Sequence, residues 1–168
     1  MKKALPLAAP LLLALTLVPT AAHAAAPVDS DRQARIDLQT QVAEVLEEFP
    51  GGEQVGPRTI SWDDGAILLE LASPLFASRA IGTCPTGRYC AWSGSAFNGS
   101  QLSFGGCTSA GWLVSLAPLA SSGGARSFAN ARSTGAIMVL NGSTTVYALS
   151  AGGSGVYMSA TTGIRCYT

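Results

Sequence analysis

The second half of the chain alternates short β-prone runs with turn residues, and this pattern most restricts the possible fold. From residue 81 to the C-terminus, each run is only three to six residues long. Asn141-Gly142, between two of these runs, is a strong signal for a type I′ β-hairpin. Many short strands without a helical period are typical of a β-sandwich or β-barrel. The runs are residues 89–92, 101–104, 136–140, 144–149, 156–158 and 164–167.

Four cysteines, an even number, all lie in this half of the chain. The 88 residues from 81 to 168 form only a small core, and disulfide bonds compensate for that. In an exported protein, four cysteines indicate two disulfide bonds, for which three pairings are possible. A zinc site is the alternative, but the spacing contains no Cys-x-x-Cys pair. We therefore expect two disulfides and no metal site among Cys84, Cys90, Cys107 and Cys166.

Residues 1–24 have the pattern of a secretory signal peptide. Lys2 and Lys3 precede an apolar run that ends in Ala22-His23-Ala24, an Ala-x-Ala-like cleavage site. A membrane anchor is the alternative, but three prolines interrupt the run, which is short against the ~20 residues that a spanning helix needs. We expect cleavage after residue 24 and a secreted, extracellular chain of about 144 residues, the remainder of the 168.

Cleavage after residue 24 removes every lysine and histidine of the chain. Histidine general bases, Ser-His-Asp triads, Cys-His pairs, histidine metal ligands and Schiff-base lysines are then excluded. From residue 81 onward there is also no Asp or Glu, so a hydrolase would have to work from hydroxyls, arginines and disulfide sulfurs, or share a site with the preceding segment. We expect no enzymatic activity, no catalytic residue and no cofactor.

Charge is divided sharply between two segments. All ten carboxylates lie between Asp29 and Glu70, whereas the only charges after residue 80 are four arginines. Such asymmetry can indicate a nucleic-acid or membrane partner. Four scattered arginines without a cluster favour a solvated surface instead, so we expect neither a nucleic-acid nor a membrane partner. We also expect the protein to be a monomer. We hypothesise that residues 25–78 either pack against the arginine-bearing domain or act as a removable pro-segment.

The acidic segment, residues 25–80, has its own pattern. A helix is predicted to about Phe49, because Asp29-Ser30-Asp31 offers caps and Pro50-Gly51-Gly52 stops it. Two β-rich runs around Asp63-Asp64-Gly65 predict a hairpin, and we interpret the two aspartates as turn residues rather than as a carboxylate pair. The apolar stripe expected on the helix consists of Ile36, Val42, Val45, Leu46 and Phe49.

The stretch WSGSAFNG combines Trp92, four residues, Phe97, one residue and Gly99. The two aromatic rings can stack across a folded turn, and glycine allows a backbone conformation that a side chain would obstruct. This spacing resembles the Greek-key motif of the βγ-crystallins, and Ser127 falls where that motif has its serine. The longer pattern CPTGRYCAW…FNG…C resembles secreted bacterial metalloproteinase inhibitors of this fold, and the preceding segment looks like one found in secreted actinobacterial relatives.

The resemblance implies a βγ-crystallin-like Greek-key β-sandwich, a mostly β fold, preceded by a short α-helix plus β-hairpin segment. The chain would then consist of a signal peptide (residues 1–24), the acidic segment (25–80) and the disulfide-bonded domain (81–168). The resemblance also implies a secreted peptidase inhibitor that blocks an extracellular protease without catalysis. The alternative is an extracellular binding or toxin-like module. The inhibitory loop is not identified, although residues 115–126 and 151–155 are candidates. The second Greek key, from residue 136, lacks the aromatic hairpin.

Microbial βγ-crystallins often bind calcium through two adjacent Asp or Asn residues that are followed by two hydroxyl residues. Ser122-Gly123 stands where the acidic pair belongs, and Arg126 stands where the first hydroxyl belongs. Calcium needs several oxygen ligands, which usually include carboxylates. We therefore expect no functional calcium site.

Overall fold

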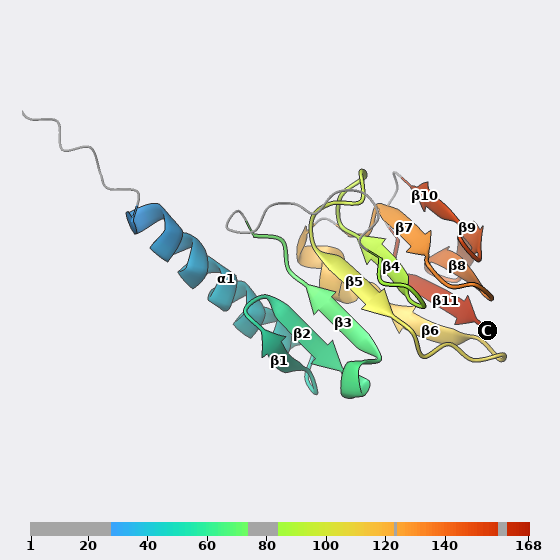
Figure 1. Cartoon of the computed structure of the whole chain (residues 1–168), viewed down its shortest axis with the longest axis horizontal. Helices are drawn as coiled ribbons and strands as arrows, with labels where there is room; N and C mark the ends of the chain where they lie inside the picture. Colours follow the sequence, from blue (N-terminus) through green and yellow to red (C-terminus); the bar gives the residue numbers. More distant parts are fainter. Residues whose placement is uncertain (1–27, 74–83, 123, 158–160) are drawn as a thin grey trace, which may run out of the picture.

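The structure is a computed structural model that describes residues 28–73, 84–122, 124–157 and 161–168. Within them, eleven strands form two antiparallel sheets, and one α-helix precedes the strands (Figure 1). The predicted mostly β fold class is confirmed, and the two sheets are consistent with a β-sandwich. The expected signal peptide, residues 1–24, and the expected domain boundary at residue 80 lie outside the described residues.

The larger sheet has seven strands in the order β1-β2-β3-β5-β4-β7-β10, and the smaller has four in the order β6-β11-β8-β9. The larger sheet consists of β1 (Glu53–Gly56), β2 (Thr59–Trp62), β3 (Ile67–Glu70), β4 (Tyr89–Trp92), β5 (Gln101–Phe104), β7 (Ser127–Asn130) and β10 (Ser154–Val156). The smaller sheet consists of β6 (Trp112–Ser115), β8 (Ala136–Asn141), β9 (Thr144–Ser150) and β11 (Gly163–Tyr167).

Two strands cross from one sheet to the other. β6 follows β5 in the chain but pairs with β11 in the smaller sheet. β10 follows β9 but pairs with β7 in the larger sheet. Each group of four consecutive strands, β4–β7 and β8–β11, therefore places its third strand in the sheet formed by the other group. This exchange ties the two sheets together.

The N-terminal segment extends the larger sheet. β3 pairs with β5 over four residues, from Ile67 opposite Phe104 to Glu70 opposite Gln101, so the sheet runs across the expected boundary at residue 80. As predicted, β2 and β3 form a hairpin, whose turn is a 3₁₀ segment (Asp63–Gly65). α1 (Val28–Glu48) lies beside β1 and β2 (Figure 1).

One buried hydrophobic cluster joins the helix, the hairpin and the sandwich. Ile60 and Leu69 from the hairpin are completely buried, as are Tyr89, Phe104 and Phe128 from the larger sheet. The N-terminal segment therefore shares the core of the disulfide-bonded half. The smaller sheet and its neighbouring loops contribute Val114, Leu116, Leu119, Ile137, Val139 and Ile164.

Some expected details are wrong. Ile36 was predicted on the buried stripe of the helix but is 51% exposed, whereas Leu38 is buried. The buried line is Leu38, Val42 and Val45, because these residues recur on one side of a 3.6-residue helix and Ile36 does not. β1, β6 and β7 were not among the runs predicted as strands. The run expected at 156–158 forms its strand earlier, as β10, because that segment pairs with β7.

Candidate functional site

A folded hairpin connects β4 to β5 and contains the aromatic motif. The rings of Trp92 and Phe97 lie 5.4 Å apart between centroids at an interplanar angle of 84°. They therefore meet edge to face, a favoured aromatic geometry, rather than stacked as expected from the sequence. Phe97 has φ 56°, a conformation that residues with a side chain seldom adopt. The ring contact holds this residue in place.

Ser127 supports the folded hairpin from the neighbouring strand β7. Its buried hydroxyl donates to the Gly94 carbonyl oxygen at 2.6 Å and accepts from the Phe97 amide at 3.1 Å. Gly99 has φ 82°, and a Cβ atom there would collide with the Ser93 hydroxyl. The structure thus brings together the four residues of the predicted fold motif, Trp92, Phe97, Gly99 and Ser127.

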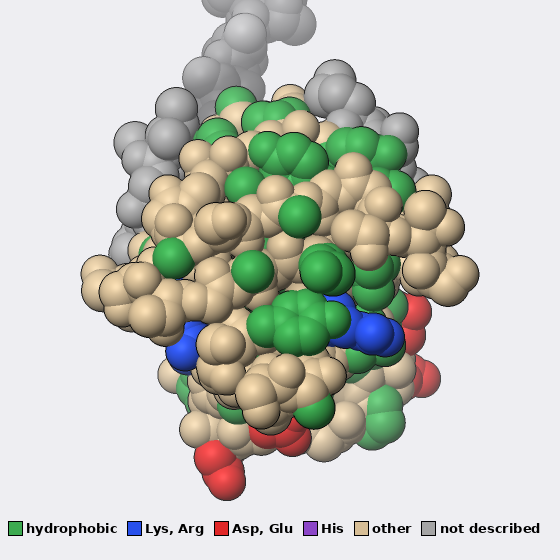
Figure 2. Space-filling model, turned by 90° about the vertical axis from the view of Figure 1, so that its right-hand side faces the viewer, with side chains coloured by type: hydrophobic (Ala, Val, Ile, Leu, Met, Phe, Trp, Pro, Cys, Tyr) green, Lys and Arg blue, Asp and Glu red, His purple; other side chains and the backbone are tan. Residues whose placement is uncertain are grey.

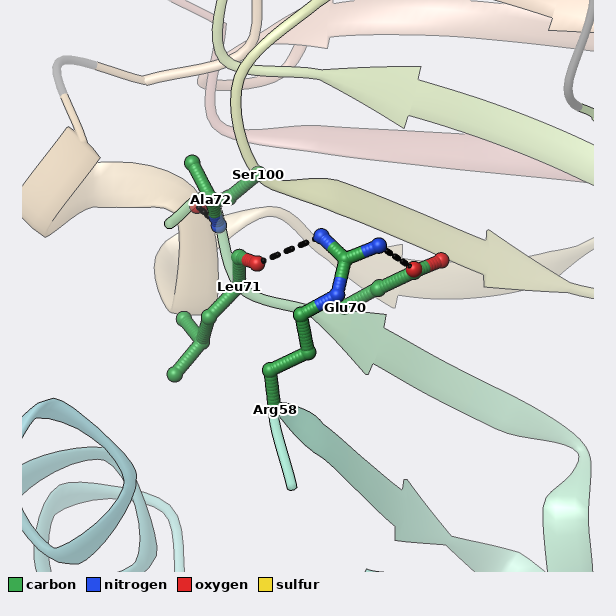
Figure 3. Close-up of polar contacts among 5 residues, drawn as sticks. All are labelled: Arg58, Glu70, Leu71, Ala72 and Ser100. Carbon is green, nitrogen blue, oxygen red and sulfur yellow. Dashed lines mark hydrogen bonds and ion pairs between the residues drawn. The ribbon is translucent and has the colours of Figure 1, made fainter. Parts of the chain in front are cut away.

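The folded hairpin is also joined to the N-terminal segment (Figure 3). The Ala72 amide, just after β3, donates to the Ser100 hydroxyl at 3.0 Å. Arg58 lies between β1 and β2, forms an ion pair with Glu70 and donates to the Leu71 carbonyl at 3.0 Å. These contacts fix the chain where it leaves β3.

Arg88 joins the two halves of the chain, and among the described residues it does so through carbonyl groups and not through an ion pair. Its Nη2 donates to the carbonyl oxygens of Gly65 and Ala66, in the β2–β3 turn, at 3.1 and 3.0 Å. It also reaches the Ser103 carbonyl at 2.9 Å. Partial burial lowers the pKa of Arg88. The two halves of the chain therefore meet here through backbone carbonyl groups.

The four cysteines form the bonds Cys84–Cys90 and Cys107–Cys166. The first bond closes a small ring that includes the exposed residues Pro85, Thr86 and Gly87. The second spans 59 residues and attaches β11 to the loop before β6. Two disulfides are as expected, and this pairing is one of the three that the sequence allowed. Each bond ties a residue outside the strands to a strand, Cys84 to β4 and Cys107 to β11, which favours rigidity in a small domain.

The two loops that the sequence offered as inhibitory candidates differ in the structure. In the 115–126 connection, Leu116, Leu119 and Ala125 are buried, so this segment is anchored in the core. Its residue 123 lies outside the described residues. The turn at 151–155 is more exposed, and its glycines exchange backbone hydrogen bonds with Asn130 on β7.

A shallow groove of about 520 Å³ crosses the outer face of the smaller sheet. Leu113 and Met138, which are 56% and 37% exposed, line it together with Thr145 and the exposed Arg165. Figure 2 views the β9–β11 end of the molecule, where apolar side chains lie in separate patches among polar surface and acidic groups lie at the margins. The groove carries no carboxylate among its lining residues.

In the described part of the chain, no group of three or more His, Cys, Asp or Glu side chains is placed to hold a metal ion. At the position compared with a calcium site, Arg126 is exposed and Ser127 is used by the folded hairpin. The expectation that calcium does not bind stays a prediction. The α-helix in the described residues has no apolar stretch long enough to cross a bilayer.

Residues 77–147 match the model of peptidase inhibitor family I36. Neither the comparison with curated proteins nor that with solved structures found a match. The matching segment, less than half of the chain, contains the Cys84–Cys90 bond, the folded hairpin and the strands from β4 to the middle of β9. The match supports a peptidase inhibitor role, and with it a non-catalytic protein whose partner is a peptidase.

Proposed function

We propose that this protein is a secreted inhibitor that blocks an extracellular peptidase by presenting a rigid loop. The match of residues 77–147 to a peptidase inhibitor family carries this proposal. Two disulfide bonds and a folded hairpin held by Ser127 supply the rigidity. Rigidity matters because a loop that is already ordered loses little conformational entropy on binding. Disulfide bonds also fit an oxidising, extracellular location after removal of residues 1–24.

We further infer a βγ-crystallin-like Greek-key fold for residues 81–168. The mutual exchange of the third strand, β6 for one group and β10 for the other, supports two interlocked Greek keys. The aromatic motif around Phe97 and the bonds of Ser127 support the same reading of the first key. The second key forms its strands around the turn at Asn141-Gly142, without an aromatic hairpin of this type.

Residues 25–80 act, in this proposal, as an integral part of the inhibitor and not as a removable pro-segment. Three contacts support this: the pairing of β3 with β5, the bonds from Arg88 to the β2–β3 turn, and the shared hydrophobic core. Removal of the segment would leave β5 as a free edge. An unpaired edge strand is a site of association between chains, so retention also favours a monomer.

Incubation of the purified mature chain, residues 25–168, with a panel of metallo- and serine peptidases tests the proposed function. We expect stoichiometric inhibition of at least one enzyme, with metallopeptidases as the first class to examine because the sequence resembles metalloproteinase inhibitors. Loss of inhibition after the inhibitor is unfolded and its disulfides are reduced is the matched control. Inertness across the panel, together with growth inhibition of neighbouring microbes, would favour a toxin-like module instead. Turnover of a peptide or ester substrate would contradict a non-catalytic protein.

A further inference from the structure

We propose that the loop of residues 131–135, between β7 and β8, enters the active-site cleft of the target peptidase. This inference rests on the proposed inhibitory function and assigns its contact site. The loop reads Ala-Arg-Ser-Thr-Gly and lies within the segment that matches the inhibitor family. Ser133 and Thr134 are exposed at its apex, whereas the residues on either side are partly buried.

A single buried side chain binds both arms of this loop. Asn130, at the end of β7, is 1% exposed. Its Nδ2 donates to the Gly135 carbonyl at 3.2 Å, and its Oδ1 accepts from the Arg132 amide at 3.1 Å. The side-chain amide thus fixes the distance between the two ends of the apex. A peptidase that binds the apex meets a loop whose shape is set beforehand.

The base of the loop is held by backbone hydrogen bonds to the first disulfide ring. The Ala131 amide donates to the Arg88 carbonyl at 3.0 Å, and the Ala131 carbonyl accepts from the Gly87 amide at 2.9 Å. Gly87 and Arg88 lie inside the ring closed by Cys84 and Cys90. The disulfide therefore stiffens the loop that lies beside it.

The charged side chain of the loop is turned away from the apex. The Arg132 guanidinium lies over the Tyr89 ring, 5.4 Å from its centroid, and Nη1 donates to the Gly105 carbonyl at 3.5 Å. Gly135, with φ 84°, packs against the Tyr167 carbonyl and the Tyr89 hydroxyl, where a Cβ atom would not fit. The apex therefore offers two small uncharged side chains on an ordered backbone.

The Cys107–Cys166 bond encloses this loop in a covalent ring. Hydrolysis of the peptide bond between Ser133 and Thr134 would add one water and create a carboxylate and an amine, yet both pieces would stay joined through that bond. The folded hairpin at 93–100 lies outside both disulfide rings, so a cut there would separate the chain without a covalent link. Cleavage within residues 131–135 would therefore not separate the two pieces of the inhibitor.

The test measures inhibition constants for the full mature chain against whichever panel enzymes the wild type inhibits. Ser133→Arg and Thr134→Arg are expected to weaken inhibition at least tenfold, since each puts a long charged side chain at the apex. Ser95→Arg, in the folded hairpin, and Ser143→Arg, in the β8–β9 turn, are matched controls at exposed serines and are expected to change the constant less than twofold. Equal melting temperatures of all four variants show that the fold is unchanged.

A second measurement separates loop positioning from general stability. With Asn130→Ala, prolonged incubation with the peptidase is expected to give faster cleavage between residues 131 and 135, located by mass spectrometry. Inhibition that persists in both apex variants would overturn the loop assignment and leave the inhibitor function standing. Cleavage that begins elsewhere in Asn130→Ala would also overturn it. A wild type that inhibits no peptidase refutes the function, and the loop assignment with it.

Discussion

Removal of the Ser127 hydroxyl is expected to destabilise the whole domain, although the side chain is small. Ser127 is completely buried on β7 and links two points of the folded hairpin, the Gly94 carbonyl and the Phe97 amide. Ser127→Ala leaves both partners in place without their hydrogen bonds. Ser127 lies opposite Trp92 on β4 and Val156 on β10, inside the larger sheet.

The expected loss follows from these two bonds. A net hydrogen bond contributes about 1 kcal/mol, and a buried polar group left unpaired costs about 1–3 kcal/mol. We expect a loss of about 3 kcal/mol in the free energy of unfolding, which lowers the melting temperature by roughly 10 °C.

Urea unfolding of the oxidised mature chain, followed by tryptophan fluorescence, measures this loss, since Trp92 contacts Phe97. Ser109→Ala is the matched control, because Ser109 is exposed in the loop after Cys107 and is expected to shift stability by less than about 0.5 kcal/mol. An equal m-value confirms that both proteins unfold between the same states. A loss below about 1 kcal/mol in Ser127→Ala would refute the view that this hydroxyl holds the hairpin.

Three further predictions concern the whole domain. The fragment of residues 81–168 lacks the strand beside β5 and the buried side chains of Ile60 and Leu69, whose burial contributes about 1.5–3 kcal/mol each. Calorimetry should therefore show a lower melting temperature for the fragment than for the mature chain. An unchanged melting temperature would favour a pro-segment. Burial raises the pKa of Tyr89, so the folded state disfavours the phenolate. Stability from this group is therefore present below the ordinary tyrosine pKa of about 10 and is lost as pH rises through the raised value; unfolding at pH 7–11 checks this, with Tyr89→Phe expected to flatten the alkaline decline. Calcium titration should leave the melting temperature unchanged, and micromolar binding would contradict the expected lack of a calcium site.

Local patterns in the sequence predict most of the β-strands because those strands carry their own signals. The run from Thr144 follows a turn at Asn141-Gly142 that fixes the β8–β9 hairpin. β1 and β6 carry weaker signals, since Glu53–Gly56 is polar and Trp112–Ser115 has only four residues. Both are strands because partners elsewhere in the chain pair with them, and pairing of this kind is not visible in a local window.

The helix shows the same limit on its buried side. The apolar spacing predicts that α1 is amphipathic, but Ile36 and Leu38 are equally apolar and only one of them meets the hairpin. The spacing of Leu38, Val42 and Val45 places them on one side of the helix without Ile36, but the packing of this side against the hairpin depends on where β1 and β2 lie. The charge partition led to the hypothesis that the two segments pack together, but it does not indicate how they meet, since Arg88 donates to the carbonyls of Gly65 and Ala66.

An inhibitor is harder to locate in a sequence than an enzyme because its site needs no reactive group. Catalytic sites require particular titratable side chains, whereas an inhibitory loop requires only an exposed apex with a fixed backbone. Here the fixing group is Asn130, an ordinary residue at a strand end, and its role depends on the return of the chain to Gly135 five residues later. The aromatic motif can be recognised in the sequence because Trp92 and Phe97 lie only five residues apart. The contact loop is defined instead by hydrogen bonds from Gly87 and Arg88, more than forty residues away along the chain, so only the folded structure reveals it.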